Sequence, residues 1–319
     1  MTDLLDRLVL VAGELHDFSG PEPEWPDGRE TLFHQSGKPL PARADVDAII
    51  PLVSQPVGET ELARLPSLRV VANYGVGYDN IDLAAAARRG VTVTNTLDVL
   101  TDATADLAMA LLLAAARRLR EGLDLARGGE WNGWHPTQLL GMGLQGRVLG
   151  ILGAGRIGVA TARRAAAFGM EIVYWNRSTC PEMESEAGGR RAEDVKSLLA
   201  EADVVSVHLP LTPETRGFLS AERLAEMKPG AILVNTARGA VVDQGAVADA
   251  LRSGYLSAAG LDVFENEPEI PAELRDLPNC VMLPHLGSAT RDARQAMWDL
   301  AAANARAVLG GEEPLTPVI

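Results

Sequence analysis

Short runs of apolar, often β-branched residues alternate along this chain with alanine-rich stretches in which apolar residues recur at helical spacing. Such alternation of strand and helix patterns is typical of βαβ units, so the sequence predicts an α/β fold with parallel sheets. Before residue 120 it predicts strands at 7–13, 47–53, 69–75 and 91–96, and helices at 82–90 and 103–119.

The alternation is interrupted by a segment that contains several glycines and two tryptophans. Residues 127–147, RGGEWNGWHPTQLLGMGLQGR, show no strand or helix period, so we interpret them as a loop with a function of its own. The pattern then resumes, and a final helix at 290–309 is stopped by two glycines and is expected to pack on the first domain. The strands predicted for one sheet in this second half are 147–153, 171–176, 203–209, 231–237, 259–264 and 280–285.

These patterns predict two domains, because the chain has 319 residues, of which 47% are hydrophobic, and can bury two cores. Residues 1–98 with 290–319 are expected to form the smaller domain, and residues 99–289 a larger one inserted into it. Ligands commonly bind in the cleft between two domains, so functional residues are expected there.

Composition excludes several classes of protein. The chain has only 2 cysteines, Cys180 and Cys280, which support neither a disulfide framework nor a metal site and fit a reducing cytoplasm. Its first residues, MTDLLDRLVLVAG, carry acids where a signal peptide needs bases. The longest apolar stretch, 107–116, is shorter than the roughly 18 residues that span a bilayer. We therefore expect a cytoplasmic protein without a membrane segment or a bound metal.

The formal net charge of −14 bears on the partners of the protein. It would repel phosphate backbones, and no basic stripe interrupts it, so nucleic acid is not an expected partner. An anionic small molecule would have to be captured locally, by a few arginines or by backbone amides.

A glycine-rich turn joins a predicted strand to an alanine-rich helix in GRVLGILGAGRIGVATARRAAAFG. In GxGxxG motifs Gly153 would make the tight turn, Gly155 would let the backbone approach a pyrophosphate, and Gly158 would allow the helix to pack on the strand. The amino end of the helix, at Arg156 and Ile157, would then face the phosphates. This context predicts a Rossmann-type, doubly wound dinucleotide-binding domain. The alternative is an ordinary glycine-rich βα turn.

A second glycine-rich turn, NYGVGYDN, also follows a predicted strand. Asn80 stands where the third glycine of the motif should be, so this turn is not expected to bind a dinucleotide.

The residues after the next strand bear on the choice between NAD and NADP. NAD enzymes commonly place an acid there for the ribose hydroxyls, but this strand ends in Asn176, Arg177 and Ser178. Glu171 begins the strand and therefore lies at the wrong end. A guanidinium and a hydroxyl suit a 2′-phosphate, so the sequence favours NADP, with NAD as a second cofactor. In the alternative interpretation Arg177 is a solvated surface arginine and both cofactors are accepted.

Three polar residues follow later strands of the same predicted sheet: Arg238, Glu267 and His285. The carboxyl ends of parallel strands line a common crevice, so these side chains are expected to converge. A protonated imidazole can donate a proton to a carbonyl oxygen that receives a hydride, and a carboxylate bonded to its other nitrogen raises an imidazole pKa and orients the ring. Arg238 could bind a substrate carboxylate. Each residue could instead be structural, but together they complete one mechanism.

With these residues in place, the chain closely resembles the D-isomer-specific 2-hydroxyacid dehydrogenase family over nearly its whole length. The motifs NYGVGYDNID, GILGAGRIG, HLPLTPETRGFL, VNTARGAVVD, GLDVFENEP and PHLGSAT appear in the order that the family has. The resemblance implies that the smaller domain is flavodoxin-like and binds the substrate.

The resemblance also implies roles for individual residues. Arg238, Glu267 and His285 would be catalytic, and the backbone amides of Val76 and Gly77 would bind the substrate carboxylate. The residues expected to contact the cofactor are Thr104, Gly153, Gly155, Arg156, Ile157, Gly158, Asn176, Arg177, Ser178, His208, Leu209, Pro210, Thr215, Thr236, Ala237, Arg238, Asp262, His285 and Gly287.

Within the family, the segment GEWNGWHP is similar to the glyoxylate and hydroxypyruvate reductase branch, in which a tryptophan from the neighbouring subunit enters the active site. Trp134 matches that position, so a homodimer is expected, with Leu52 or Val53 on the opposite wall of the pocket. The alternative is a tryptophan packed on its own domain.

The sequence therefore predicts NAD(P)H-dependent reduction of glyoxylate or hydroxypyruvate to a D-2-hydroxy acid. The alternatives are a 2-ketogluconate-type or aromatic 2-oxo acid reductase, and a nucleotide-sensing corepressor of the same fold. Formate is disfavoured as a substrate, because the related formate dehydrogenases usually pair the histidine with glutamine, and this chain has Glu267. The chain ends at Ile319 without an appended regulatory domain, which disfavours a regulated phosphoglycerate dehydrogenase.

Overall fold

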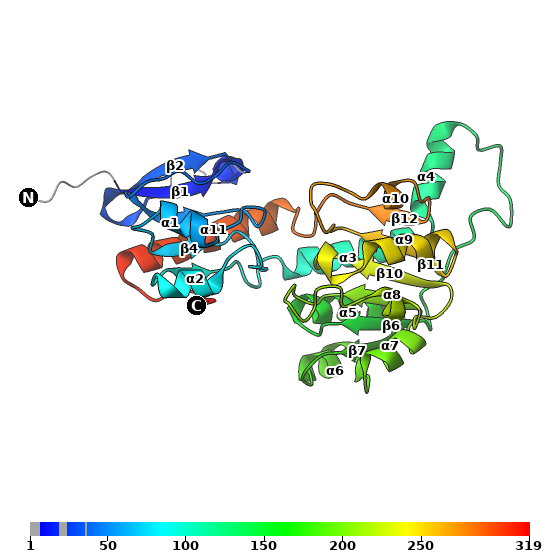
Figure 1. Ribbon diagram of the computed structural model, residues 1–319. Helices are drawn as coiled ribbons and strands as arrows, with labels where there is room; N and C mark the ends of the chain where they lie inside the picture. The colour runs from blue at the N-terminus through cyan, green and yellow to red at the C-terminus, as the bar shows by residue number, and fades with distance from the viewer. Residues whose placement is uncertain (1–6, 19–23, 36) are drawn as a thin grey trace, which may run out of the picture. The chain divides into compact units, whose positions relative to one another are not determined.

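The chain is described by a computed structural model that covers residues 7–18, 24–35 and 37–319 (Figure 1). It divides into two compact units. Unit 1 consists of Met1–Leu100 and Ala289–Ile319, and unit 2 consists of Thr101–Ser288. Each unit is built around a parallel sheet with helices packed on it, so the predicted α/β class is confirmed.

Unit 1 has a five-stranded sheet whose strands run in the order β2-β1-β3-β4-β5. All the pairings are parallel, and the order is that of flavodoxin-like sheets. The strands are β1 (Leu8–Ala12), β2 (Glu30–His34), β3 (Val46–Ile50), β4 (Val70–Ala72) and β5 (Thr92–Thr94). The helices are α1 (Glu59–Arg64), α2 (Leu83–Arg88) and α11 (Arg291–Gly310), with 3₁₀ segments at Gly13–Phe18 and Pro26–Gly28.

Helix α11 is contributed by the end of the chain and packs on β3 and β4 (Figure 1). Thr290 caps it by accepting a hydrogen bond from the N–H of Ala293, and it ends at Gly311, whose φ is 80°. Both boundaries agree with the sequence, because a threonine N-cap and a glycine in the left-handed region are common helix ends.

Unit 2 has a seven-stranded sheet in the order β12-β11-β10-β9-β6-β7-β8. Counted from β6, this is the Rossmann order 3-2-1-4-5-6 extended by one more strand. Its strands are β6 (Val148–Leu152), β7 (Glu171–Trp175), β8 (Arg190–Arg191), β9 (Val204–Val207), β10 (Ala231–Asn235), β11 (Leu256–Leu261) and β12 (Cys280–Met282). Its helices are α3 (Thr101–Ala116), α4 (Leu119–Gly128), α5 (Arg156–Ala167), α6 (Pro181–Ala187), α7 (Val195–Glu201), α8 (Ala221–Leu224), α9 (Gln244–Arg252) and α10 (Ala272–Arg275).

The sheet of unit 2 is covered on both faces, as doubly wound folds require. Leu233 of β10 packs in a cluster with residues of α7 and α9, whereas its neighbours Ile232 and Val234 pack in a second cluster with residues of α3 and α5. Successive side chains of a strand point to opposite faces, so the two clusters lie on opposite sides of the sheet.

Helix α3 lies close to this sheet because β11 contains Gly260. A Cβ on Gly260 would lie 2.9 Å from Cβ of Leu111 in α3. The close approach fixes the position of α3, which carries Thr104 near its first turn. Of the helices in the described ranges 7–18, 24–35 and 37–319, none is long and apolar enough to cross a membrane.

Candidate active site

The carboxyl ends of β11 and β12 bring Glu267 and His285 together. Nδ1 of His285 lies 2.7 Å from Oε2 of Glu267, and Oε1 of Glu267 accepts a hydrogen bond of 2.9 Å from the N–H of Phe264. An ionised carboxylate can only accept, so Nδ1 carries the proton in this contact and Nε2 is the ring nitrogen that can face a ligand. Both side chains are about one-third exposed, as a pair that meets a ligand must be.

The carboxylate of Glu267 is ionised at neutral pH. Burial alone would raise its pKa, but the hydrogen bond and charge of His285, together with the charge of Arg238, outweigh burial and hold the pKa below its ordinary value. The sheet edge thus places a negative charge directly behind the imidazole.

Asp262 fixes the backbone around His285. This side chain is fully buried, and its two oxygens accept hydrogen bonds of 2.7 and 2.8 Å from the N–H groups of Leu286 and Gly287. The N–H of His285 donates to the backbone oxygen of Asp262. Burial raises the pKa of Asp262, although both backbone hydrogen bonds and the charge of His285 act to lower it. A turn of three residues is therefore bound to a single aspartate.

Arg238 follows β10 and lies near the same edge. Gly239 makes this possible, because a Cβ there would lie 2.0 Å from the carbonyl carbon of Phe264. The segment after β10 can thus approach the segment that leads to Glu267. The backbone of Arg238 is held by Asn235, whose Nδ2 donates 2.9 Å to the Arg238 oxygen, and Nη1 of Arg238 donates 2.8 Å to the oxygen of Ala237.

The glycine loop between β6 and α5 has the geometry of a phosphate-binding turn. Gly153 has φ of 99°, and a Cβ there would lie 2.7 Å from the oxygen of His208. A Cβ on Gly158 would lie 2.3 Å from the oxygen of Gly153, whereas a Cβ on Gly155 would meet nothing within 4 Å. The first and third glycines are thus required by packing, and Gly155 leaves open space in front of the amino end of α5, where Arg156 and Ile157 lie. That space fits a pyrophosphate.

The segment Asn176–Arg177–Ser178 lies beside this loop, since the N–H of Gly153 donates 3.0 Å to the oxygen of Trp175 at the end of β7. Glu171 lies at the other end of β7, so no acid occupies the usual ribose position. The side-chain amide of Asn176 donates hydrogen bonds to the backbone oxygen and to Oγ of Ser178. Sequence reasoning missed Arg191 of β8, whose Nη2 donates to the oxygens of Asn176 and Arg177 at 2.9 and 3.2 Å.

The segment after β9 forms the next part of the same edge. Nε2 of His208 lies 2.9 Å from Oγ of the buried Ser206, and burial lowers the pKa of His208 to about 4, so the ring is uncharged at neutral pH. Leu209 is buried, and Pro210 is exposed. Thr215 lies in the same turn and is partly exposed, and its Oγ1 donates a hydrogen bond of 2.5 Å to the oxygen of Pro210.

Two observations in unit 2 fit a bound dinucleotide. Thr236 lies after β10, beside Ala237, and its buried Oγ1 lacks a hydrogen-bond partner among the described residues. Thr104 is buried at the start of α3, and a Cβ on Gly287 would lie 3.4 Å from both Thr104 Cγ2 and Asp262 Oδ2. Thr104, Asp262 and Gly287 therefore lie together beside His285. No group of three or more His, Cys, Asp or Glu side chains in the described ranges is placed to hold a metal ion.

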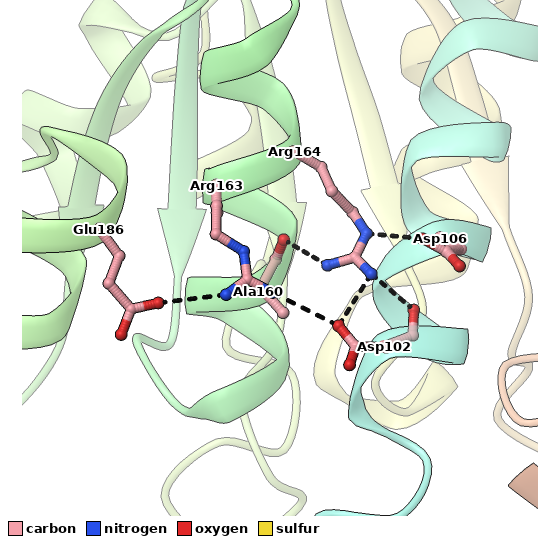
Figure 2. Close-up of polar contacts among 6 residues, drawn as sticks. All are labelled: Asp102, Asp106, Ala160, Arg163, Arg164 and Glu186. Atoms are coloured by element: carbon pink, nitrogen blue, oxygen red, sulfur yellow. Dashed lines mark hydrogen bonds and ion pairs between the residues drawn. The ribbon is translucent and has the colours of Figure 1, made fainter.

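Figure 2 shows how α3 is joined to α5, the helix that follows the glycine loop. Nε of Arg164 donates 2.6 Å to Oδ1 of Asp106, and Nη2 donates 2.8 Å to Oδ1 of Asp102. Arg163 lies farther from its partners, at 3.5 Å from Asp102 and 3.4 Å from Glu186. Arg164 thus connects the helix that carries Thr104 with the helix at the glycine loop.

Four predicted residues of the substrate pocket lie in unit 1: Leu52, Val53, Val76 and Gly77. Val76 and Gly77 follow β4 in an irregular turn. Leu52 lies beside this turn, because it forms a single parallel β-bridge with Tyr74. A Cβ on Gly75 would lie 2.3 Å from Cγ1 of Val53, so the turn packs directly on this wall. Sequence reasoning also missed the buried asparagines Asn73 and Asn95, whose side-chain amides donate hydrogen bonds to backbone oxygens of this turn.

Trp134 does not pack on its own unit, which excludes the interpretation of this residue as a core tryptophan. Its side chain is 81% exposed, in a segment after α4 that lacks regular structure. Helix α4 and this segment project from the rest of unit 2 (Figure 1).

Comparisons with known proteins agree with this geometry. Residues 109–287 match the family model described as D-isomer specific 2-hydroxyacid dehydrogenase, NAD binding domain. A glyoxylate reductase from Thermococcus litoralis is 52% identical over 274 residues, covering 85% of this chain and 82% of that protein. A glyoxylate reductase from Thermococcus kodakarensis is 49% identical over 298 residues, covering 92% and 88%.

A solved structure extends the likeness to three dimensions. The NADPH-dependent glyoxylate/hydroxypyruvate reductase from Sinorhizobium meliloti, in complex with NADP and malonate, superposes with a TM-score of 0.88. It is 37% identical, and the match covers 98% of this chain and 97% of that one. The chain therefore belongs to the D-isomer specific 2-hydroxyacid dehydrogenase family, whose members are NAD(P)-dependent oxidoreductases.

Proposed function

We propose that the protein reduces small 2-oxo acids, glyoxylate and hydroxypyruvate, to the corresponding D-2-hydroxy acids. The contact of 2.7 Å between His285 Nδ1 and Glu267 Oε2 is the observation that carries the proposal, because it provides an oriented proton donor at the edge of a dinucleotide-binding sheet. Curated relatives at about 50% identity are named glyoxylate reductases, which supports the choice of substrate.

The reaction adds a hydride to the carbonyl carbon and a proton to the carbonyl oxygen. A bound reduced nicotinamide supplies the hydride. His285 gives its Nε2 proton to the oxygen as negative charge develops there, and Glu267 stabilises the positive ring before the transfer. Arg238 holds the substrate through its carboxylate or ketone oxygen, and the amides of Val76 and Gly77 bind the carboxylate.

Replacement of His285 by Gln tests this mechanism. Glutamine cannot donate a proton as an acid, so kcat for glyoxylate should fall by about 10² to 10⁴ while the Kd for NADPH stays within about twofold. His16→Gln, at an exposed histidine of the segment Gly13–Phe18, serves as the matched control and should keep the parent rate. If His285→Gln retains turnover with the same pH profile, the assignment fails, and a parent protein that binds NADPH but reduces no 2-oxo acid would favour a nucleotide sensor.

We also propose a preference for NADP over NAD. The absence of an acid after β7, and the presence of Arg177 and Ser178 there, support a site for the 2′-phosphate. Arg191 adds a second guanidinium beside the same segment. The test compares kcat/KM for NADPH and NADH in the parent and in Arg177→Ala.

Loss of one charged contact to phosphate should lower kcat/KM for NADPH about tenfold and leave the value for NADH nearly unchanged. Arg190→Ala is the control, because Arg190 lies on β8 next to Arg191 but pairs with Glu201. A parent with a strong preference for NADH would refute the proposal.

We further propose that the active protein is a homodimer in which Trp134 enters the pocket of the partner subunit. The exposed apolar residues of α4 and of the segment after it support this arrangement, since such residues are usually covered by a partner.

We also propose that the protein is located in a reducing cytoplasm. Its two cysteines, Cys180 and Cys280, are both free and buried, which supports this location.

A further inference from the structure

The turn after β4 presents three consecutive backbone carbonyls to hydrogen-bond donors of unit 1. The oxygen of Gly75 accepts from the N–H of Thr96 at 3.0 Å and from Nδ2 of Asn73 at 3.3 Å. The oxygen of Val76 accepts from Nδ2 of Asn95 at 3.0 Å, and that of Gly77 from Nδ2 of Asn73 at 2.8 Å. Two asparagine side chains therefore bond all three carbonyls.

The direction of a carbonyl fixes the direction of the next amide. In a trans peptide the C=O of one residue and the N–H of the following residue point in opposite directions. A Gly75 carbonyl held against the protein turns the N–H of Val76 away from it, and a held Val76 carbonyl turns the N–H of Gly77 away. In the described part of the chain, neither of these N–H groups donates to a backbone acceptor. Successive outward amides form a concavity that binds anions.

Both asparagines are built into the unit rather than attached to its surface. Asn73 is 0% exposed and directly follows β4, and Asn95 is 7% exposed and directly follows β5. Nδ2 of Asn80 lies 3.4 Å from Oδ1 of Asn73 and donates 3.0 Å to the oxygen of Gln55. This arrangement directs the Asn73 amide nitrogen toward the turn and ties the turn to the segment that contains Leu52 and Val53.

We propose that Asn73 and Asn95 are positioning residues for the substrate: by binding the carbonyls of Gly75, Val76 and Gly77 they hold the Val76 and Gly77 amides ready for the substrate carboxylate. The inference rests on the proposed function, which assigns the carboxylate to these amides. Neither asparagine touches the substrate. Their contribution is that the turn is already ordered when the carboxylate arrives, so less free energy is spent on ordering it.

The test separates carboxylate binding from cofactor binding. Oxamate, an unreactive analogue of a 2-oxo acid, is titrated into the complex of the protein with NADPH, for the parent and for Asn95→Ala and Asn73→Ala. Asn95→Ala removes one neutral hydrogen bond to the turn, and Asn73→Ala removes two. The Kd for oxamate should therefore rise about three- to tenfold for Asn95→Ala and by more for Asn73→Ala, while the Kd for NADPH stays within about twofold.

Asn279→Ala is the matched control. The Asn279 amide also donates to two backbone carbonyls, those of Leu251 and Ser257, both at 3.2 Å, but it precedes β12 in unit 2. The control should leave both dissociation constants unchanged. The proposal is overturned if folded Asn73 and Asn95 variants keep the parent Kd for oxamate, if their affinities for oxamate and NADPH fall together, or if oxamate does not bind the parent.

If a variant fails to fold, a measurement on the unmodified protein tests the proposal instead. We expect the backbone ¹⁵N resonances of Val76 and Gly77 to shift on addition of oxamate, and their N–H groups to exchange rapidly with solvent in its absence. Amides already protected from exchange in the free protein would overturn the inference. The proposed function fails separately, if the parent binds oxamate but turns over neither glyoxylate nor hydroxypyruvate.

Discussion

His285 has a left-handed backbone conformation, with φ of 55°, which costs about 1 kcal/mol for a residue with a side chain. Asp262 compensates for this cost through hydrogen bonds to His285, Leu286 and Gly287. The buried aspartate therefore serves the orientation of the proton donor. Sites that hold strained residues are commonly functional sites.

At the residue scale, the sequence predicted which residues lie at the sheet edge and that Glu267 pairs with His285, but not the backbone contacts that hold them. Arg238, Glu267 and His285 could be singled out because each follows a strand that the apolar pattern predicts. The role of Asn73 and Asn95 depends on carbonyl directions in a turn, and no sequence period reports those. By contrast, the contact of His208 with Ser206 follows the strand period, because side chains two residues apart point to the same face.

The buried ring of His208 predicts how the free energy of unfolding depends on pH. Burial lowers its pKa from 6.5 to about 4, so the unfolded chain binds a proton at a higher pH than the folded one. This contribution to stability is fully present above pH 6.5 and is lost as pH falls toward 4. At about 1.4 kcal/mol per pKa unit, the free energy of unfolding should drop by about 2 kcal/mol between pH 7 and pH 5 from this group alone.

Urea unfolding at the two pH values tests this in the parent and in His208→Asn. Asparagine does not titrate, so the variant should show a pH difference smaller by about 2 kcal/mol. Exposed His135→Asn should keep the parent difference. If His208→Asn has the same pH dependence as the parent, another group is responsible.

At the element scale, the sequence predicted the central strands and the edge strands β5 and β12, but it missed β2 and β8. β2 and β8 lie at the edges of their sheets, β8 has only 2 residues, and neither β8 residue is buried. These two edge strands bury little surface and so leave no apolar pattern to recognise. The break between α3 and α4 was also missed, because it depends on the left-handed conformation of Arg118, whose φ is 52°.

The contact between α3 and α5 predicts a difference between two neighbouring arginines (Figure 2). Arg164 is 23% exposed and pairs with Asp102 and Asp106 at 2.8 and 2.6 Å, whereas Arg163 is 52% exposed with longer contacts. Exposed pairs contribute about 0–1 kcal/mol each. Arg164→Ala should therefore lower the free energy of unfolding by about 1–2 kcal/mol, and Arg163→Ala by about 0.5 kcal/mol or less.

Salt provides the check on this interpretation. At about 1 M NaCl the deficit of Arg164→Ala measured by urea unfolding should shrink, because the charges are screened. A deficit that does not depend on salt would point to lost packing of the arginine side chain instead. Equal effects of the two substitutions would contradict the geometry.

At the scale of the whole molecule, α4 has an apolar face that nothing in the described part of the chain buries. Leu119 and Leu123 lie one turn apart on it and are 50% and 55% exposed, and Trp131, Trp134 and Leu140 follow with 59%, 81% and 66% exposure. Residues spaced by four lie on one side of a helix, so Leu119 and Leu123 form a continuous strip. A second copy of the chain would cover such a surface.

Leu123→Glu places a charge in this strip and should halve the mass measured by light scattering after gel filtration. The control is Leu315→Glu, at a residue of unit 1 that is 62% exposed, and it should leave the mass unchanged. An unaltered mass for Leu123→Glu would contradict a dimer through α4. A parent that is monomeric would contradict the dimer altogether.

Trp134→Ala separates assembly from pocket shape. If Trp134 of one subunit narrows the pocket of its partner, this substitution should keep the dimer but enlarge the pocket, so that kcat/KM for phenylpyruvate rises relative to that for glyoxylate by about tenfold. The monomeric Leu123→Glu protein should show the same change, because it lacks the partner that supplies the tryptophan. A Trp134→Ala dimer with the parent ratio would show that the exposed indole contributes to the interface but not to the choice of substrate.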